Sequence, residues 1–396
     1  MDRRRYTFAP LVAVALTMNA CSTGSNQSTT SPATSGTASS AATAPGSPSP
    51  SDSPSDTPQE SATTPAQASP GQVTMAFAGD VHFERQVAPL LQDSDEVWST
   101  RLPELKAADF AMVNLETALA TSGSPVPKAY TFRAPPTALG KLKAAGVDAV
   151  SMANNHAADY GRTGVQQTLA AKATNVLPIV GFGENASVAY APLTVDVKGM
   201  RVAVLAASQV AEETARNWAA GSDSPGIAVA LDRTKLRAAV KEAADTHDLV
   251  VVMLHWGTEG TSCPNESQAA TARDLEADGA DVIVGTHAHR PQGSGWKGRA
   301  FVGYGTGNFI WYNTSATSRP SGVLTLTVDG DRAVARGQAT GDARRTPTSL
   351  VTDYRWAPKY IAYNGVPKNP EGATVDRLNS LARQATSCAA LDQKPS

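Results

Sequence analysis

From Val73 onward, short apolar runs alternate with amphipathic stretches along the chain. The runs have the length of buried strands, and several stretches between them carry apolar residues at helical spacing. The expected strands are Val73–Ala78, Phe110–Val113, Ala149–Met152, Arg201–Ala206, Leu249–Leu254, Val282–Val284 and Phe301–Tyr304. The expected helices are Pro136–Ala145, Gly164–Ala173, Asp232–Ala244 and Ser267–Asp278. Strands and helices in this order predict an α/β domain built around largely parallel strands.

The end of this pattern predicts a β-hairpin and then a looser tail. Gly322–Val328 and Arg332–Thr340 flank the pair Asp329-Gly330, which favours a tight turn between two antiparallel strands. The sequence contains no internal repeat and no second long linker, so we expect one domain over residues 73–340. Residues 341–396 are expected to form a C-terminal extension that is partly irregular.

The first twenty residues have the pattern of an export signal. A basic start, Arg3–Arg5, is followed by the short apolar stretch Phe8–Met18 and by Ala20. This order is typical of a secretory signal peptide, which we predict over residues 1–20. Cys21 comes next, and the segment resembles the lipobox of bacterial lipoproteins, which implies that Cys21 carries a lipid. The alternative is an ordinary signal peptide that happens to precede a cysteine.

Residues 21–72 differ sharply in composition from the rest of the chain. From residue 22 they consist almost wholly of Ser, Thr, Ala, Pro, Gly and Gln, with no aromatic residue and no Lys or Arg. Such a segment cannot bury enough apolar surface to offset its chain entropy, so we predict a disordered linker. The expected location is therefore the extracytoplasmic face of the cell membrane, with the membrane as a partner through the lipid on Cys21.

Net charge and cysteine content bear on the partners of the protein and on its covalent links. The formal net charge is −2, so nothing favours nucleic acid as a partner. Cys263 and Cys388 are the cysteines that remain after Cys21. Disulfides persist in exported domains, so these two could pair and tie the tail to the loop after His255. Two unpaired thiols are the alternative.

Histidines and acids follow the expected strands. Five of the six histidines in the chain do so: His82, His156, His255, His287 and His289. Asn114 and Glu116 follow Phe110–Val113 in the same way. Because the carboxyl ends of parallel strands meet at one edge of a sheet, these side chains should share a site. Imidazole and carboxylate are ligands of divalent Mn, Fe and Zn, so a metal site is predicted. His247, inside a helical pattern, is interpreted as structural.

Six motifs at these positions resemble the CapA family, the poly-γ-glutamate capsule biosynthesis proteins related to calcineurin-like metallophosphoesterases. The motifs are Gly79-Asp80-Val81, Asn114-Leu115-Glu116, Asn154-Asn155-His156, His255-Trp256-Gly257, Gly285-Thr286-His287-Ala288-His289 and Gly307-Asn308-Phe309. They run in order from about Val73 to about Val328. The resemblance implies a four-layer α-β-β-α sandwich of metallophosphoesterase type, in which two sheets lie face to face.

The resemblance also implies roles for the site residues. One divalent ion would be held by Asp80, His82 and His289. A second would be held by Asn155, His255 and His287. Glu116 would bridge the two ions, His156 would donate a proton to the leaving group, and Asp159 would orient His156. The chain departs from the family pattern at Gly260, after Glu259, and at Ala288, and these departures affect substrate preference more than chemistry.

Two ions, each Mn, Fe or Zn, would make the protein an envelope hydrolase. Its substrate would be a phosphoester or an amide bond of an anionic envelope polymer, linked to capsule or poly-γ-glutamate metabolism. Lys128, Tyr130 and Arg133 could hold an anionic substrate, or could form an ordinary solvated loop. The alternative function is a non-catalytic accessory role in synthesis or export of the polymer, within a capsule-synthesis complex.

Overall fold

The computed structural model describes residues 69–341, 344 and 348–395. The predicted signal peptide 1–20, the lipidation of Cys21 and nearly all of the predicted linker 21–72 lie outside these residues. Within them, no helix has both the length and the apolar composition needed to cross a membrane.

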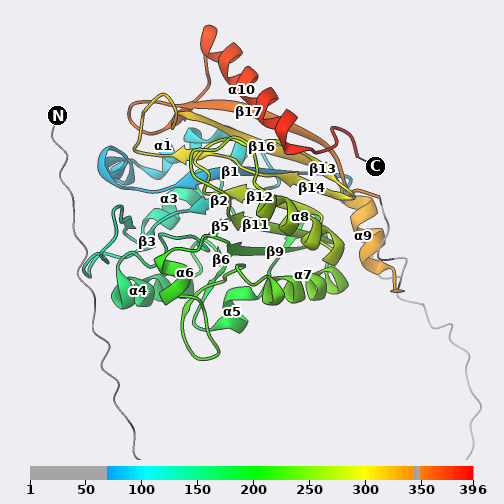
Figure 1. The fold of residues 1–396 in the computed structure, drawn as a ribbon, viewed down its shortest axis with the longest axis horizontal. Helices are drawn as coiled ribbons and strands as arrows, with labels where there is room; N and C mark the ends of the chain where they lie inside the picture. Colours follow the sequence, from blue (N-terminus) through cyan, green and yellow to red (C-terminus); the bar gives the residue numbers. More distant parts are fainter. Residues whose placement is uncertain (1–68, 342–343, 345–347, 396) are drawn as a thin grey trace, which may run out of the picture. The chain divides into compact units, whose positions relative to one another are not determined.

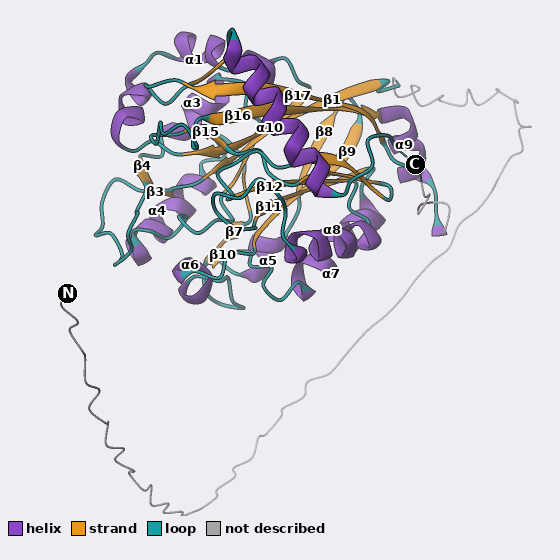
Figure 2. Cartoon of the chain, turned by 45° about the horizontal axis from the view of Figure 1, so that its top comes forward, coloured by secondary structure: helices purple, strands orange, loops and turns teal. Residues whose placement is uncertain are grey.

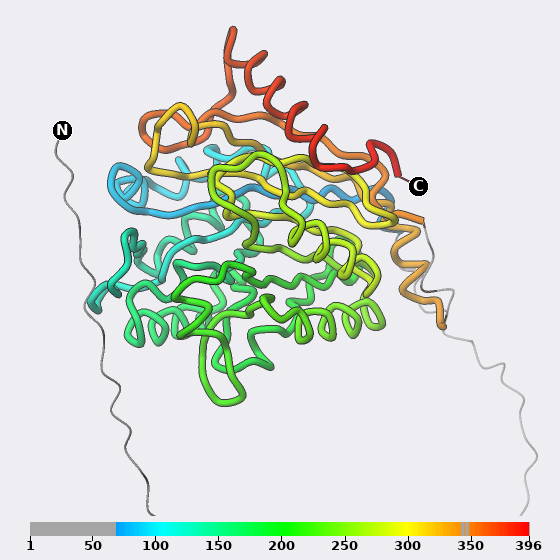
Figure 3. Tube along the Cα trace, in the orientation of Figure 1, coloured from blue at the N-terminus to red at the C-terminus, as the bar shows by residue number. Residues whose placement is uncertain are grey.

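Two large sheets form the centre of the domain. The first has eight strands in the order β18-β17-β16-β1-β2-β5-β6, with β15 also paired to β1. Its strands are β1 (Gln72–Val81), β2 (Phe110–Leu115), β5 (Ala149–Ser151), β6 (Ile179–Val180), β15 (Asn308–Ile310), β16 (Pro320–Asp329), β17 (Val351–Ile361) and β18 (Pro367–Lys368). Strands β1, β2, β5 and β6 are parallel, whereas β16, β17 and β18 pair antiparallel. In Figure 3 the blue β1 runs beside the yellow-to-orange β16, so the two ends of the domain meet in this sheet.

The second sheet has six strands in the order β13-β14-β12-β11-β9-β8. They are β8 (Leu193–Val197), β9 (Met200–Ser208), β11 (Leu249–His255), β12 (Val282–Thr286), β13 (Ser294–Lys297) and β14 (Ala300–Gly303). The four central strands are parallel and the two edge strands are antiparallel. Two short pairs complete the strands: β3 (Ala118–Leu119) with β4 (Arg133–Ala134), and β7 (Phe182–Gly183) with β10 (Gly226–Ile227).

Most of the helices lie on the outer faces of the two sheets, but one of them packs Ala333 into the core between the sheets. They are the 3-10 helix η1 (Arg85–Gln92), α1 (Asp95–Arg101), α2 (Pro103–Lys106), α3 (Ala138–Ala144), α4 (Gly161–Ala173), α5 (Ala186–Tyr190), α6 (Glu213–Asn217), α7 (Thr234–Thr246), α8 (Glu266–Asp278), α9 (Gly330–Gln338) and α10 (Ala373–Ala389). Figure 1 shows α10 beside β17 at the top, with α5 and α7 beyond β9 on the opposite side. Figure 2 shows α10 crossing in front of the strands.

Strand alternation explains the layers, because successive side chains of a strand point to opposite faces. In β1, Val73, Met75 and Phe77 enter a cluster shared with β9, β11 and β12, which is the core between the sheets. Ala76 and Ala78 instead enter a cluster with the helices that cover the first sheet. A third cluster lies between the second sheet and α7 and α8. The predicted four-layer α-β-β-α architecture is confirmed.

The predicted hairpin after Gly322 is wrong. The Asp329 side chain accepts a hydrogen bond from Arg332 N (3.0 Å) and so caps the start of α9. The segment that we expected to be the second strand is therefore helical. The antiparallel partner of β16 is β17, which lies farther along the chain. Asp before Gly suits a turn and a helix N-terminus alike, and the capping role prevails here.

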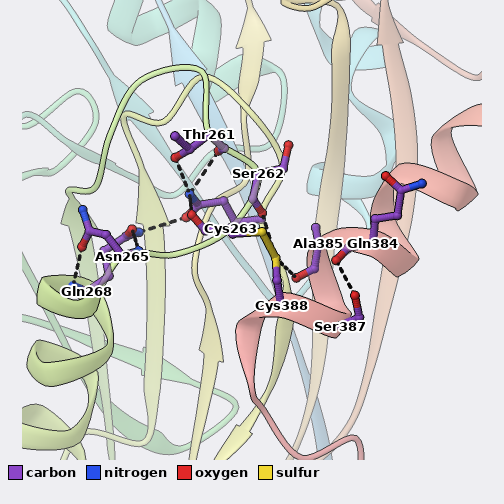
Figure 4. The surroundings of a disulfide bond; sticks show 10 residues. Thr261, Ser262, Cys263, Asn265, Gln268, Gln384, Ala385, Ser387 and Cys388 are labelled. Carbon is purple, nitrogen blue, oxygen red and sulfur yellow. Dashed lines mark hydrogen bonds between the residues drawn. A yellow bond between two sulfur atoms is a disulfide. The ribbon is translucent and has the colours of Figure 1, made fainter.

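The C-terminal part is more regular than we predicted. Residues 348–395 contribute β17 and β18 to the first sheet and then form α10. A disulfide joins Cys388, near the end of α10, to Cys263 in the loop after β11, with Cα atoms 5.6 Å apart (Figure 4). The tail is thus bound to the domain by strand pairing and by a covalent link.

Candidate metal centre

Polar side chains from both sheets meet where the parallel strands end. The first sheet and its loops supply Asp80, Glu116, Asn155 and His156. The second sheet supplies His255, the last residue of β11, and His287 and His289, which follow β12. All seven are buried except His289, whose side chain keeps 19% of its area exposed. The structure therefore brings together six of the seven predicted metal ligands, together with His156.

The backbone at the end of β12 and directly after it is unusually constrained. A Cβ at Gly285 would lie 2.0 Å from Tyr304 O and 2.1 Å from Trp256 Nε1, so only glycine fits at this position. His287 and His289 have φ angles of +85° and +53°, in the region that favours glycine. Such conformations cost on the order of 1 kcal/mol or more each and occur often at functional sites. Backbone strain thus coincides with two candidate ligands.

Glu116 is the least satisfied group of the site. It is fully buried, and neither carboxylate oxygen has a hydrogen-bond partner. Oε1 lies 3.5 Å from His255 Nε2, 3.8 Å from His156 Nε2 and 3.9 Å from His289 Nε2. Burial, reinforced by the charge of Asp80, raises the pKa of Glu116 well above its ordinary value. A buried carboxylate surrounded by imidazoles is an incomplete group, and a bound cation would complete it.

One group of donors lies around His255. Glu116, His255 and His287 place ligand atoms within 4.8 Å of one another, and His287 Nδ1 is buried without a hydrogen-bond partner. Asn155 Oδ1 lies 2.9 Å from His255 Nε2. The Asn155 amide is oriented by Glu212, which accepts a hydrogen bond from its Nδ2 (2.9 Å). The oxygen of Asn155 therefore faces the same point as the imidazoles.

The ring of His255 is oriented by hydrogen bonds to both of its nitrogens. His255 Nδ1 lies 3.0 Å from the Thr286 hydroxyl and 3.2 Å from Asn114 Nδ2, an amide nitrogen that can only donate. Nδ1 therefore accepts, and the ring proton lies on Nε2, which donates to Asn155 Oδ1 (2.9 Å); a bound cation would replace that proton. Hydrogen bonds of this kind, made by the second nitrogen of a histidine ligand, orient the ring at metal sites.

A second group of donors consists of Asp80, Glu116 and His289. Asp80 Oδ2 lies 3.1 Å from His289 Nδ1, and Asp80 Oδ1 accepts from Asn114 Nδ2 (2.9 Å). Burial lowers the pKa of His289, but the hydrogen bond and charge of Asp80 outweigh it, and the net pKa is raised. Glu116 is shared by the two groups, as the predicted bridging position requires.

His82 does not join either group, in contrast to its predicted role as a ligand. Its ring nitrogens face backbone N–H groups instead: Nδ1 lies 3.1 Å from Glu84 N and Nε2 lies 3.3 Å from Tyr312 N. The ring stacks on Phe132, with centroids 4.5 Å apart, and meets Trp311 edge-on at 4.3 Å. Aromatic packing and the two amides thus turn this histidine away from the candidate ligands.

His156 and Asp159 form the predicted pair. His156 Nδ1 lies 2.5 Å from Asp159 Oδ2, which leaves Nε2 directed toward Glu116. Burial raises the pKa of Asp159 to about 6, while burial and then the charge of Lys128 lower the pKa of His156. Phe132 stacks on the imidazole at 4.1 Å and restricts its rotation.

The predicted substrate-binding residues have separate positions. Lys128 is largely buried and donates to Asn155 O (2.7 Å) and Asp159 Oδ1 (3.0 Å), so it supports the histidine–aspartate pair. Tyr130 is 58% exposed. The Arg133 guanidinium lies over the Tyr160 ring at 4.5 Å. Of these three residues, Lys128 is the one whose charged group is hydrogen-bonded to other residues of the site.

Residues 74–313 match the model of the bacterial capsule synthesis protein family, PGA_cap. The chain belongs to this family. The predicted family is thereby confirmed, and the match covers the whole run of motifs from β1 to the segment after β15.

Three proteins with capsule, PGA or polyglutamine synthesis in their names are similar to much of the chain. The PGA biosynthesis protein CapA of Bacillus subtilis is 28% identical over 64% of this chain and 67% of its own length. The capsule biosynthesis protein CapA of Bacillus anthracis is 30% identical over 61% of this chain and 60% of its own length. A probable polyglutamine synthesis accessory protein of Mycobacterium tuberculosis is 29% identical over 56% of this chain and 61% of its own length.

Among solved structures, this family member is similar to the NAD nucleotidase NadN of Haemophilus influenzae. The sequences are 12% identical, and the match covers 82% of this chain and 65% of that chain with a TM-score of 0.41. A TM-score this low carries no argument about function. The site described above therefore rests on the residues of this chain.

Sequence reasoning missed three contributors to the site. Glu259 forms a further group of donors with His287 and His289. Glu212 orients Asn155, and Thr286 contacts His255. Glu259 and Glu212 lie in loops where acidic residues are common, so neither carried a distinct signal. Thr286 lies within a recognised motif, but its partner could not be read from the spacing.

Proposed function

We propose that this protein is a divalent-metal-dependent hydrolase of the cell envelope. Its substrate class would be a phosphoester or an amide bond of an anionic capsule polymer such as poly-γ-glutamate. The observation that carries the proposal is Glu116, a buried carboxylate without hydrogen-bond partners, with three imidazoles within 4 Å of its Oε1. One of these imidazoles, that of His156, is held by Asp159 in the manner of a proton donor.

Two divalent ions fit the donors. Glu116, Asn155, His255 and His287 would hold one ion, and Asp80, Glu116 and His289 would hold the other. Imidazole together with carboxylate suits Mn, Fe and Zn. Bound ions of this kind would supply Lewis-acid polarisation of the scissile group and a lowered pKa for the attacking water.

The chain itself would supply proton transfer and orientation. Asp159 accepts from Nδ1 of His156, so Nε2 is the atom that would pass a proton to the leaving group. Lys128 neutralises part of the buried charge of Asp159 and fixes the loop that carries Asn155. Tyr130 is exposed, and we propose that it and Arg133 contact an anionic substrate.

The proposal also includes an envelope polymer as substrate or partner and a location outside the cell membrane. Two relatives are named as CapA proteins of capsule or PGA biosynthesis, which supports an envelope polymer as substrate or partner. The signal sequence 1–20, the lipid on Cys21 and the linker 21–72 would place the domain outside the cell membrane.

A non-catalytic accessory role in polymer synthesis or export, within a capsule-synthesis complex, is the second candidate. One relative is named as a probable accessory protein of polyglutamine synthesis, which favours this role. The same donors would then bind metal and polymer without turnover.

Metal content and hydrolysis, measured on the same preparations, test both candidates. We expect about two ions per chain by elemental analysis. We also expect Mn²⁺-dependent hydrolysis of bis-p-nitrophenyl phosphate or of poly-γ-glutamate. His156→Gln should keep the metal and lose about 10²- to 10⁴-fold in turnover.

His247→Gln is the matched control, because His247 bonds Thr194 and Ala243 away from the site. It should keep both metal and turnover. A folded protein that binds no metal would contradict the hydrolase proposal. Bound metal without turnover on either substrate would favour the accessory role.

A further inference from the structure

The loop after β11 carries an acidic side chain to the open side of the site. Glu259 Oε1 lies 3.9 Å from His289 Nε2, and Glu259, His287 and His289 place ligand atoms within 4.8 Å of one another. Two donors bound to one ion at about 2.1 Å each lie at most about 4.2 Å apart, so this pair fits a shared cation. The Glu259 side chain is 59% exposed, so no packing of its own holds it there.

The backbone of this loop is fixed directly after Glu259. Gly260 N donates to Ala288 O (2.9 Å), which attaches the loop directly between the two histidines. Gln292 Nε2 reaches Thr261 O and Cys263 O, both at 3.2 Å. Gln292 is itself held by Gln268 of α8 (2.9 Å). These bonds determine where the Glu259 carboxylate can reach.

The disulfide adds an anchor from a distant part of the chain. Cys263 follows Glu259 by four residues and is bonded to Cys388, 125 residues farther along (Figure 4). Helix α10 is packed closely enough to serve as this anchor: a Cβ at Gly293 would lie 2.5 Å from Ala385 O. Leu378, Ala385 and Ala389 are the buried residues of this helix.

The second ion position has room for another ligand. His82 is turned away from it, so Asp80, Glu116 and His289 are the donors that the structure groups there. A divalent cation of the Mn, Fe or Zn type prefers four or more ligands. The acidic residue that reaches the His287–His289 edge of the site is Glu259.

We propose that Glu259 is a metal-binding residue at this edge, and that the Cys263–Cys388 disulfide holds it in place through the loop. The inference rests on the proposed function, because it assumes that the centre binds divalent ions. It makes the affinity for one of the two ions dependent on the covalent attachment of α10. Reduction of the disulfide would then weaken one ion position and leave the other intact.

Calorimetric titration of the metal-free full-length protein with Mn²⁺ tests this. Glu259→Gln should weaken one ion by about 10-fold or more and leave the other unchanged. Cys263→Ser with Cys388→Ser should weaken the same ion. Glu259→Gln in that background should add little further loss, because both changes remove the same contact. Glu266→Gln, an exposed acid on α8, is the matched control and should bind as the wild type does.

The titration distinguishes failure of the proposed function from failure of the inference about Glu259. If the wild-type protein binds no Mn²⁺, the proposed function fails. If it binds two ions and Glu259→Gln binds them equally well, only the present inference fails. If the losses of Mn²⁺ affinity from Glu259→Gln and from the double cysteine variant are additive, the disulfide does not act through Glu259. Glu259 would then still be a ligand. Glu259 is exposed, so its substitution is informative even where the cysteine variant is unstable.

Discussion

Two buried carboxylates at opposite ends of the strands differ in their partners: one has a full set of hydrogen bonds and ion pairs, and the other has no hydrogen-bond partner. Asp281 directly precedes β12, and its oxygens accept from Arg336 at 2.6 and 2.7 Å, from Arg299 at 2.8 Å and from Val250 N at 2.9 Å. Burial raises the pKa of Asp281, but the charges and hydrogen bonds of the two arginines outweigh it, and the net pKa is lowered. The chain itself supplies every partner of this acid.

Glu116, after the end of β2, has the same burial and none of these partners. The neighbouring cation, Lys128, is bonded to Asp159 instead, and the pKa of Glu116 is raised. A carboxylate whose partners are complete stabilises the fold, whereas one left incomplete is available to a ligand. The difference distinguishes an acid whose partners the fold supplies from one that the fold leaves without partners.

The largest expected effect is on the structural acid. Asp281→Asn should lower the free energy of unfolding by about 3–5 kcal/mol, because Arg336 is left buried without its charge partner. Urea denaturation of metal-free protein measures this. Asp223→Asn, at an exposed loop acid, is the control and should change little. A loss below 1 kcal/mol at Asp281 would remove the basis of the comparison.

Metal should stabilise the protein through Glu116 and not through Asp281. Mn²⁺ at about 100 times its dissociation constant should raise the free energy of unfolding by about 2.7 kcal/mol. Thermal unfolding with Mn²⁺ and with a chelator measures this gain. Glu116→Gln should lose the gain, and Asp281→Asn should keep it. Equal gains in both variants would place the ions elsewhere.

Acid should remove the contribution of the Asp281–Arg336 ion pair only at low pH. Because the folded-state pKa of Asp281 is depressed, its contribution is complete above the unfolded value of about 3.9 and is lost as pH falls through the folded value. The difference in stability between wild type and Asp281→Asn should therefore narrow in chelator as pH falls below about 4. A constant difference down to pH 2.5 would contradict this reasoning.

The smallest effect is expected at the functional acid in the absence of metal. Glu116→Gln should change the free energy of unfolding by about 1 kcal/mol or less, since no partner is lost. Urea denaturation in chelator measures it beside Asp281→Asn. A loss as large as that of Asp281→Asn would show that Glu116 supports the fold after all.

Most of the fold was predictable because its signals are local. The apolar runs that became β1, β2, β9, β11 and β12 were read from the sequence, as were helices α3, α4, α7 and α8. The error at Asp329 arose because one residue type serves both turns and helix caps. Strand β17 was missed because its apolar pattern is weak: most of its residues are exposed or only partly buried.

In the site, too, some features could be read from the local sequence and others could not. His82 and His156 had equal standing in the sequence, yet Phe132 stacks on both rings while only His156 faces Glu116. Glu259 had no signal of its own and reaches the site through a loop fixed by Gln292 and Cys388. Both outcomes depend on segments far away in the chain.

The sequence alone determined which donors exist and that they lie at strand ends, because strand alternation and chain order are local properties. The tertiary structure decided which of them converge. Ring orientation at His82 depends on Trp311 and Tyr312, and the lack of partners at Glu116 depends on where Lys128 is bonded. Such choices are made by packing between distant segments, and short motifs do not encode that packing.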